Sequence, residues 1–319
     1  MHPIATTFVS AALLLGLTAG PTVFAVDADQ DPAPPTAVPA QDEAPTGALA
    51  QLLATLSEEG VDLDLDGGLV SIEAAVGVRS QLVEYLLVGP GGATHESLLY
   101  TRVTPSLLNA GLLALGANPG RNARWVEVEP EPPLGEAEGG SEAEAGDDGE
   151  AADAPLADRP RFRIVPPHGD GFYLYTAWRE EDEVFFFRVE DLVANLETGR
   201  AMQRAPFVFL GSRMATIAGM VRPLERDEEE RPADDEMLFI ADYERNLINL
   251  VYFREGNTLL TASHGEGTRE DVWAANIWNL PDTDQPLRLI FSREKLERVP
   301  EGLVDGLPLV VRPDEPARW

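Results

Sequence analysis

The stretch GFYLYTAWREEDEVFFFRV, residues 171–189, decides the fold of this chain. Aromatic and β-branched side chains fill residues 172–178 and 184–189, and the charged run Arg179–Asp182 separates them. Two such apolar runs around a short polar turn are typical of paired β-strands. The sequence therefore predicts an antiparallel hairpin here, within a domain built mainly of strands.

Alternation with a period of two extends this pattern toward the N-terminus. Apolar and acidic side chains alternate over residues 61–66, and apolar residues return at 70 and 72 after the turn Asp66–Gly68. Because successive side chains of a strand point to opposite faces, this pattern predicts a second hairpin. Further strands are expected at residues 82–88, 95–103, 207–210, 237–241, 247–252, 287–291 and 307–311.

Three short helices complete the expected fold. The first spans residues 46–60, where four leucines fall on one face. The second spans residues 104–116, with Thr104 at the N-cap and Pro105 at the first helical position. The third covers residues 191–198. The predicted fold class is therefore α+β: a mainly antiparallel β domain with two or three short helices, plus disordered acidic segments.

The N-terminus has the layout of a secretory signal peptide. Phe8–Ala19 is an apolar run, and residues 23–25 form a V-x-A cleavage pattern. The run is shorter than the roughly 20 apolar residues that cross a bilayer, and no later segment is apolar enough. We therefore expect a signal peptide over residues 1–25, no transmembrane segment after its removal, and a periplasmic or secreted protein.

The acidity of the chain is concentrated in segments of low complexity. The formal net charge is −31; residues 26–46 carry five acidic side chains, residues 127–158 carry twelve, and neither segment carries a basic one. Both segments have too few large apolar side chains to fold. We expect a disordered Pro/Ala/Asp tether at 26–46 and a disordered acidic insertion at 127–158. Nucleic acid is excluded as a partner, because such charge repels phosphates.

Strand-like residues flank the acidic insertion on both sides, which predicts one domain made of residues 47–126 and 159–292, followed by a C-terminal tail at 293–319. Two small domains joined by the acidic stretch are the alternative. The sequence has no cysteine. Disulfides, a thiolate nucleophile and a cysteine-ligated iron–sulfur cluster are therefore excluded for this chain.

Several stretches resemble the YdjY-domain family of exported bacterial proteins. They are Val83–Leu86, Thr94–Leu99 and Pro105–Gly120, followed by Phe207–Ser212 and Leu247–Leu250. The resemblance covers about residues 58–292 apart from the acidic loops. It implies the single domain and an envelope protein of no established reaction. Some members are called ferredoxin-like lipoproteins, but neither the lipid anchor nor the cluster carries over to a chain without cysteine.

Five residues form the candidate ligand-binding set: His95, Glu96, Gly211, Ser212 and Asp242. A histidine beside a carboxylate is able to supply a metal ligand or a general base. The alternative is a structural histidine and a surface glutamate, because neighbouring strand residues point to opposite faces.

Two other histidines and one serine are further candidates for metal binding or catalysis. His168 and His264 lie in Gly-rich loops at a spacing that matches no zinc motif. Ser97, with His95 and Asp242, has the composition of a hydrolytic triad, but no G-x-S-x-G elbow surrounds it. No catalytic motif is assembled in the sequence.

A calcium-loop formula is present at Asp62, Asp64, Asp66 and Glu73, with Gly67 in its usual place. Three carboxylates and a terminal glutamate suit this hard cation. However, Gly60 interrupts the entering helix and no second loop is present. The same residues fit a strand, a turn and a second strand, so calcium is the alternative and the hairpin the main prediction.

These patterns predict an uncharacterised exported accessory or binding protein of the cell envelope. It needs no cofactor, and its partner is a small molecule or an envelope protein of unknown identity. Trp273 and Trp278, five residues apart, either line a binding groove or cover the edge of the core. The alternative functions are a metal-dependent or hydrolytic enzyme using His95 and Glu96, and a calcium-binding protein.

Overall fold

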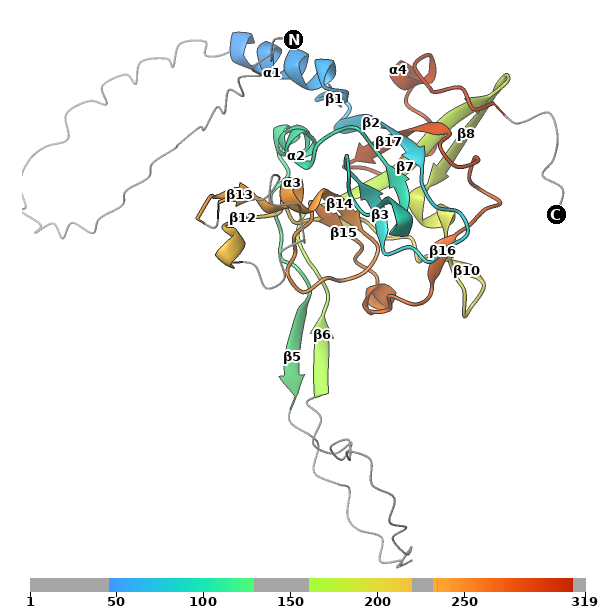
Figure 1. Cartoon of the computed structure of the whole chain (residues 1–319). Coiled ribbons are helices and arrows are strands. Elements are labelled where there is room, and N and C mark those ends of the chain that lie inside the picture. The colour runs from blue at the N-terminus through green and yellow to red at the C-terminus, as the bar shows by residue number, and fades with distance from the viewer. Residues whose placement is uncertain (1–45, 129–160, 220–231, 234, 312–319) are drawn as a thin grey trace, which may run out of the picture. The chain divides into compact units, whose positions relative to one another are not determined.

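The computed structural model describes residues 46–128, 161–219, 232–233 and 235–311 (Figure 1). The expected signal peptide lies outside these residues, as does all but one residue of the expected tether. The expected insertion lies outside them from residue 129 onward. Its first two residues, Glu127 and Val128, instead end strand β5 (Arg124–Val128), which pairs with β6 (Arg161–Val165).

Eight strands close into a mixed barrel. Their order around the barrel is β2 (Leu69–Val76), β17 (Pro286–Ser292), β7 (Gly171–Glu180), β11 (Phe207–Phe209), β15 (Leu260–Thr261), β14 (Asn246–Asn249), β3 (Tyr85–Val88) and β4 (Ser97–Tyr100), and β4 returns to β2. The α+β class is confirmed. The antiparallel expectation is wrong at two pairings, β14–β15 and β3–β4, which are parallel.

The remaining strands attach to this barrel or form small sheets of their own. β1 (Val61–Asp64) pairs with β2, and β8 (Glu183–Arg188) pairs with β7. The hairpin β5–β6 extends away from the barrel (Figure 1). The small sheets contain β9 (Val193–Asn195), β10 (Arg200–Ala201) and β16 (Trp273–Ala275), and β12 (Met214–Ala215) with β13 (Leu238–Phe239).

The described residues contain four α-helices, and the predictions for two of them are confirmed. α1 (Thr46–Glu58) ends before Gly60, and α2 (Pro105–Ala114) buries Leu108 and Leu112. Two further helices are short: α3 (Ile240–Glu244) and α4 (Glu301–Val304). No helix in the described ranges is long and apolar enough to cross a membrane.

The helix expected at residues 191–198 is wrong. Residues 189–192 form a 3₁₀ turn, and β9 and β10 then make a tight hairpin. The side chain of Asn195 accepts hydrogen bonds from the backbone N–H groups of Glu197 and Thr198, which stabilises a turn in place of a helix. Gly199 completes that turn with φ of 64°.

The hairpin of residues 171–189 is confirmed, and its strand β7 contributes side chains to two clusters of the core. Trp178 of β7 is buried between Phe185 and Phe187 of β8, and Tyr175 stacks on Phe186. Strands β3, β4 and β2, which precede residues 129–160, lie next to one another in the barrel, and they meet the strands that follow those residues at the β2–β17 and β3–β14 pairings. The last described residues pack here too: Val299 and Leu307 contact the cluster around Tyr175.

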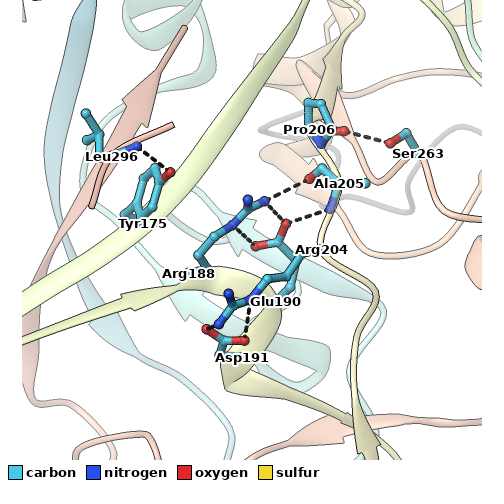
Figure 2. A network of polar contacts seen from close by, with 9 residues as sticks. All are labelled: Tyr175, Arg188, Glu190, Asp191, Arg204, Ala205, Pro206, Ser263 and Leu296. Atoms are coloured by element: carbon cyan, nitrogen blue, oxygen red, sulfur yellow. Dashed lines mark hydrogen bonds and ion pairs between the residues drawn. The ribbon is translucent and has the colours of Figure 1, made fainter. Parts of the chain in front are cut away.

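A buried ion pair fixes the end of this hairpin (Figure 2). Arg188 contacts both carboxylate oxygens of Glu190 and donates to the carbonyl of Ala205, while the N–H of Ala205 donates to Glu190. Burial raises the pKa of Glu190, and Arg188 opposes that rise. Beside it, Arg204 and Asp191 form a second pair, whose arginine side chain is 61% exposed.

Replacing Arg188 by Met should destabilise the protein strongly, because Glu190 would stay buried without its cation. We expect a loss of about 3–5 kcal/mol in the free energy of unfolding, measured by urea titration. The matched control is Arg204→Met, for which a loss below about 1 kcal/mol is expected at this exposed pair. Equal losses in the two variants would contradict this assignment.

Candidate functional site

The structure places His95 and Glu96 on an exposed 3₁₀ turn, Thr94–Glu96, before β4. The strand expected from residue 95 therefore begins two residues later, at Ser97. The turn brings the two side chains together, with His95 Nε2 lying 3.3 Å from Glu96 Oε1, and the His95 side chain is 73% exposed. Ser97 is buried and donates its hydroxyl to the carbonyl of Leu99, so it has the role of a structural serine.

The other three candidates hold helix α3 in place. Gly211 and Ser212 both have positive φ, and a side chain at Gly211 would clash with Pro119. The hydroxyl of Ser212 accepts the N–H of Ala241 at the start of α3. Asp242, within α3, accepts the backbone N–H of Ser106 at 2.8 Å and so caps helix α2.

Asp242 therefore caps the N-terminus of helix α2, a role that the sequence predicted for Thr104. Thr104 occupies the N-cap of α2 but its side chain makes no capping hydrogen bond. We expect Asp242→Ala to lower the free energy of unfolding by about 1 kcal/mol, the usual loss for a helix cap. Thr104→Ala is the control and should change it by much less. The reverse order in chemical denaturation would show that Thr104 is the cap.

The four carboxylates of the calcium formula lie along a β-hairpin. Asp62 and Asp64 belong to β1, Glu73 to β2, and Asp66 to the turn between them. Asp62 accepts a hydrogen bond from Arg288 at 2.9 Å, and Asp64 accepts the N–H of Gly67. Within the described ranges, no group of three or more histidine, aspartate and glutamate side chains is arranged to hold a metal ion. The hairpin is confirmed, and calcium binding stays a prediction.

The two tryptophans do not form a groove together. Trp273 is fully buried, whereas Trp278 is 86% exposed. Trp273 instead packs edge-on against His264, with ring centroids 5.2 Å apart. Both ring nitrogens of His264 lack a hydrogen-bond partner within the described part of the chain, and burial lowers the pKa of His264 to about 4.

His264 should make the protein less stable in mild acid. Below pH 6.5 the unfolded chain binds a proton at this residue, whereas the folded chain does so only near pH 4. The contribution of the neutral, buried His264 to the free energy of unfolding is complete above pH 6.5 and is lost as the pH falls from 6.5 to 4. We expect the loss to be about 3 kcal/mol relative to His264→Leu, measured by urea titration at each pH.

A parent and a His264→Leu variant with parallel profiles between pH 4 and 7 would refute the burial of a neutral His264.

A pocket of about 690 Å³ opens where β3 and β14 meet the loop after β14. It is lined by aromatic rings, amides and carboxylates, and its position was not anticipated from the sequence. The lining residues are Tyr85, Trp125, Glu244, Asn246, Asn249, Tyr252, Phe253, Arg254, Glu255, Asn257, Thr268 and Glu270. Eight of these residues are polar or charged and four are aromatic, so the lining suits a polar ligand better than an apolar one.

One buried amide organises two of the carboxylates. Arg213 Nε donates to Asn257 Oδ1 at 3.0 Å, which fixes the amide so that its Nδ2 faces the pocket residues. That Nδ2 donates to Glu244 at 2.5 Å and to Glu255 at 3.0 Å. Burial, assisted by the charge of Glu255, raises the pKa of Glu244 to about 7. The pocket thus contains a carboxyl group, that of Glu244, which exchanges its proton near neutral pH.

Asn249 is the second buried amide of the pocket wall. Its residue is 2% exposed, and its Oδ1 has no hydrogen-bond partner among the described residues. The ladder between β14 and β3 is irregular on both sides of Ile248, so the pairing of Asn249 with Tyr85 follows a break in register. Bulges of this kind redirect side chains and are frequent next to functional sites. Because Asn249 is also one of the residues that line the pocket, its unsatisfied buried acceptor favours a ligand with a donor group.

Tyr85 forms the aromatic face of the same pocket. Its ring stacks on Phe253 with centroids 5.3 Å apart, and Asn122 holds the loop by donating to the carbonyl of Phe253. Burial raises the pKa of Tyr85, and so do four nearby carboxylates, those of Glu84, Glu96, Glu244 and Glu270. Tyr85 therefore lies at the centre of a group of negative charges.

Two of the predicted site residues lie within electrostatic reach of this pocket. The pKa of Glu84, which neighbours Tyr85, is raised by burial and then by Glu96 and Glu270, and lowered by His95. Glu270 lines the pocket, whereas Glu96 and His95 belong to its surroundings. The sequence thus located a turn near the site and missed the residues that line it.

One pattern in the sequence could have indicated the residues that line the pocket. Asn246 and Asn249 bracket Leu247–Ile248 in a stretch expected to be an apolar strand, and buried strand positions seldom carry amides without a reason. The segment Phe253–Asn257 follows, with an aromatic ring, two charges, a glycine and an amide. No family model, curated protein or solved structure matches this chain.

Proposed function

We propose that this protein is an exported accessory protein of the cell envelope that binds a small polar ligand in the pocket between β3, β14 and residues 250–257. One observation carries the proposal: Asn249, which is 2% exposed and whose Oδ1 has no hydrogen-bond partner among the described residues, is one of the residues that line a pocket of about 690 Å³. A buried acceptor without a partner costs about 1–3 kcal/mol of stability, so its retention favours a role in ligand binding.

The lining supports binding more than it supports catalysis by the residues expected from the sequence. His95 and Glu96 lie on an exposed turn, where water competes for any reacting group. The pocket, in contrast, presents amides, carboxylates and stacked rings around one volume. Fixed polar groups orient a ligand, and apolar rings supply contact area, which together give specificity without a reaction.

Export is proposed from the first 25 residues and from the resemblance to the YdjY-domain family. The apolar run Phe8–Ala19 and the V-x-A pattern at residues 23–25 favour a cleaved signal. Membership of that family, the periplasmic or secreted location and a partner in the envelope stay predictions. The absence of cysteine from the whole chain is compatible with any of these locations.

A thermal-shift screen of the full chain tests the binding function. The screen should include neutral sugars, amines, amino acids and organic anions, each at up to about 100 times a plausible dissociation constant. A ligand at that excess stabilises the folded state by about 2.7 kcal/mol, which corresponds to a rise in Tm of about 5–10 °C. We expect at least one class to give such a rise.

Two variants connect the shift with the pocket. Asn249→Leu keeps the size of the side chain and removes the acceptor, so it should abolish the shift. Glu73→Gln changes an exposed carboxylate of β2 that is not among the pocket residues, so it should keep the shift. A screen without any shift, or a shift that survives in Asn249→Leu, would refute the proposed site.

A further inference from the structure

We propose that the ligand of this pocket is a small organic cation, an amine or a guanidinium compound, whose charged group lies among Glu244, Glu255 and Glu270. Its apolar part would pack on the stacked rings of Tyr85 and Phe253. This inference rests on the proposed binding function and adds to it the chemical class of the ligand. It is carried by the charge, the acceptors and the aromatic face of the pocket.

The charge of the lining favours a cation. Three glutamates and one arginine, Arg254, line the pocket. The guanidinium of Arg254 lies over the rings of Trp125 and Phe162, at 5.2 and 5.5 Å from their centroids. Arg254 is therefore held against two rings of the β5–β6 pair, and the lining as a whole carries three carboxyl groups against one guanidinium. An anionic ligand would have to approach these carboxylates in a partly buried site, which costs free energy.

The polar groups of the wall favour a ligand that donates hydrogen bonds. The Oδ1 of Asn249, which has no partner among the described residues, is an acceptor, and a carboxylate offers acceptors only. Nδ2 of Asn257, a donor of the site, is already used by Glu244 and Glu255. An ammonium group has three donors and a guanidinium five, and neither has an acceptor. The unpartnered Oδ1 of Asn249 and the donors of a cation are therefore complementary.

The aromatic face of the pocket offers a contact between ring faces and a cation, which a neutral polar ligand would make less favourably. Tyr85 and Phe253 are stacked with an angle of 13° between their planes, and both line the pocket. Ring faces attract cations, by about 0.5–2 kcal/mol depending on exposure, and also cover the methylene groups of an aliphatic amine. The pocket lining therefore combines carboxylates, which would bind the charged group of the ligand, with rings, which would cover its carbon chain.

Cation binding should be linked to the release of a proton from Glu244. The pKa of this carboxyl group is about 7 in the free protein, and a bound cation stabilises its charged form. The charged or titratable groups around it, besides the ligand, are Glu255, Arg213, Arg254, Tyr85 and Glu270. Affinity should therefore rise with pH, by about tenfold between pH 6 and pH 8 if the cation holds Glu244 fully ionised.

The experiment compares matched probes on the full chain by isothermal titration calorimetry. 1,4-Diaminobutane and agmatine are the cations, and 1,4-butanediol is the neutral counterpart of the diamine. Glucosamine and glucose form a second pair that differs by one ammonium group. We expect the charged member of at least one pair to bind at least tenfold more tightly than its neutral counterpart at pH 6, where every amine is protonated. The affinity of 1,4-diaminobutane and agmatine, which stay charged, should rise about tenfold from pH 6 to pH 8.

Three variants locate the binding. Glu244→Gln should lower the affinity at pH 8 and remove the pH dependence, and Glu255→Gln should lower the affinity as well. Glu73→Gln is the control and should bind as the parent does. Each variant is first compared with the parent by its Tm without ligand, so that loss of the fold is not read as loss of the site. If Glu244→Gln unfolds, Glu255→Gln and the probe pairs still decide the question.

The possible outcomes separate this inference from the function on which it rests. Binding of the neutral members as tightly as the charged ones would overturn the cation and leave the binding protein standing. No binding by any probe class would overturn both. Cation binding that survives in the Glu244→Gln, Glu255→Gln double variant would place the cations on the acidic segments outside the pocket and would overturn the inference.

Discussion

The structure depends on the double pairing of strand β2. Over seven residues β2 is hydrogen-bonded to β17, and its last two residues, Ala75 and Val76, also pair with β4. This second contact closes the sheet into a barrel, so these eight strands present no continuous free edge to another chain. Closure also fixes β3 between β4 and β14. The wall of the pocket is built from that neighbourhood.

The pocket occurs where the closed sheet is least regular. β14 has four residues and two breaks in its register with β3, and it is preceded by Arg245 in the left-handed conformation. The positive φ of Arg245 ends α3 and turns the chain directly into β14, so that Glu244 and Asn246 line one volume. A regular strand would have placed its amides in alternation across the sheet. The irregular ladder gathers them on one side.

The sequence predicted the elements whose signal is local. The hairpin of residues 171–189, the hairpin of residues 61–76 and helix α2 follow from alternation and from the Thr104–Pro105 start. The closure of the barrel was not predictable in this way. It depends on the pairing of β4 with β2 and on the parallel pairing of β3 with β4, and both are tertiary contacts that a local sequence pattern does not specify. Two-residue strands such as β15 carry too little pattern to be recognised.

The candidate site escaped prediction for a related physical reason. Its chemistry depends on which carboxylates a single amide, Asn257, brings together, and that amide is itself oriented by Arg213 from 44 residues away. Two of the predicted residues hold the helix that ends at Glu244: Ser212 accepts a hydrogen bond at the start of α3, and Asp242 joins α3 to α2. They position Glu244 and are not themselves among the residues that line the pocket.

The acidic residues of this protein fall into two groups, those in low-complexity runs and those that line the pocket. Much of the net charge of −31 is visible in composition, in low-complexity runs such as residues 26–46 and 127–158. A carboxylate surrounded by water and salt is screened over about 8–10 Å and selects no ligand. Glu244 and Glu255 line a pocket beside stacked rings and share one amide, so their charges repel each other with less screening. The cation that we propose as the ligand would relieve this repulsion between Glu244 and Glu255. Its selectivity would then follow from the geometry of the pocket and not from the net charge of the chain.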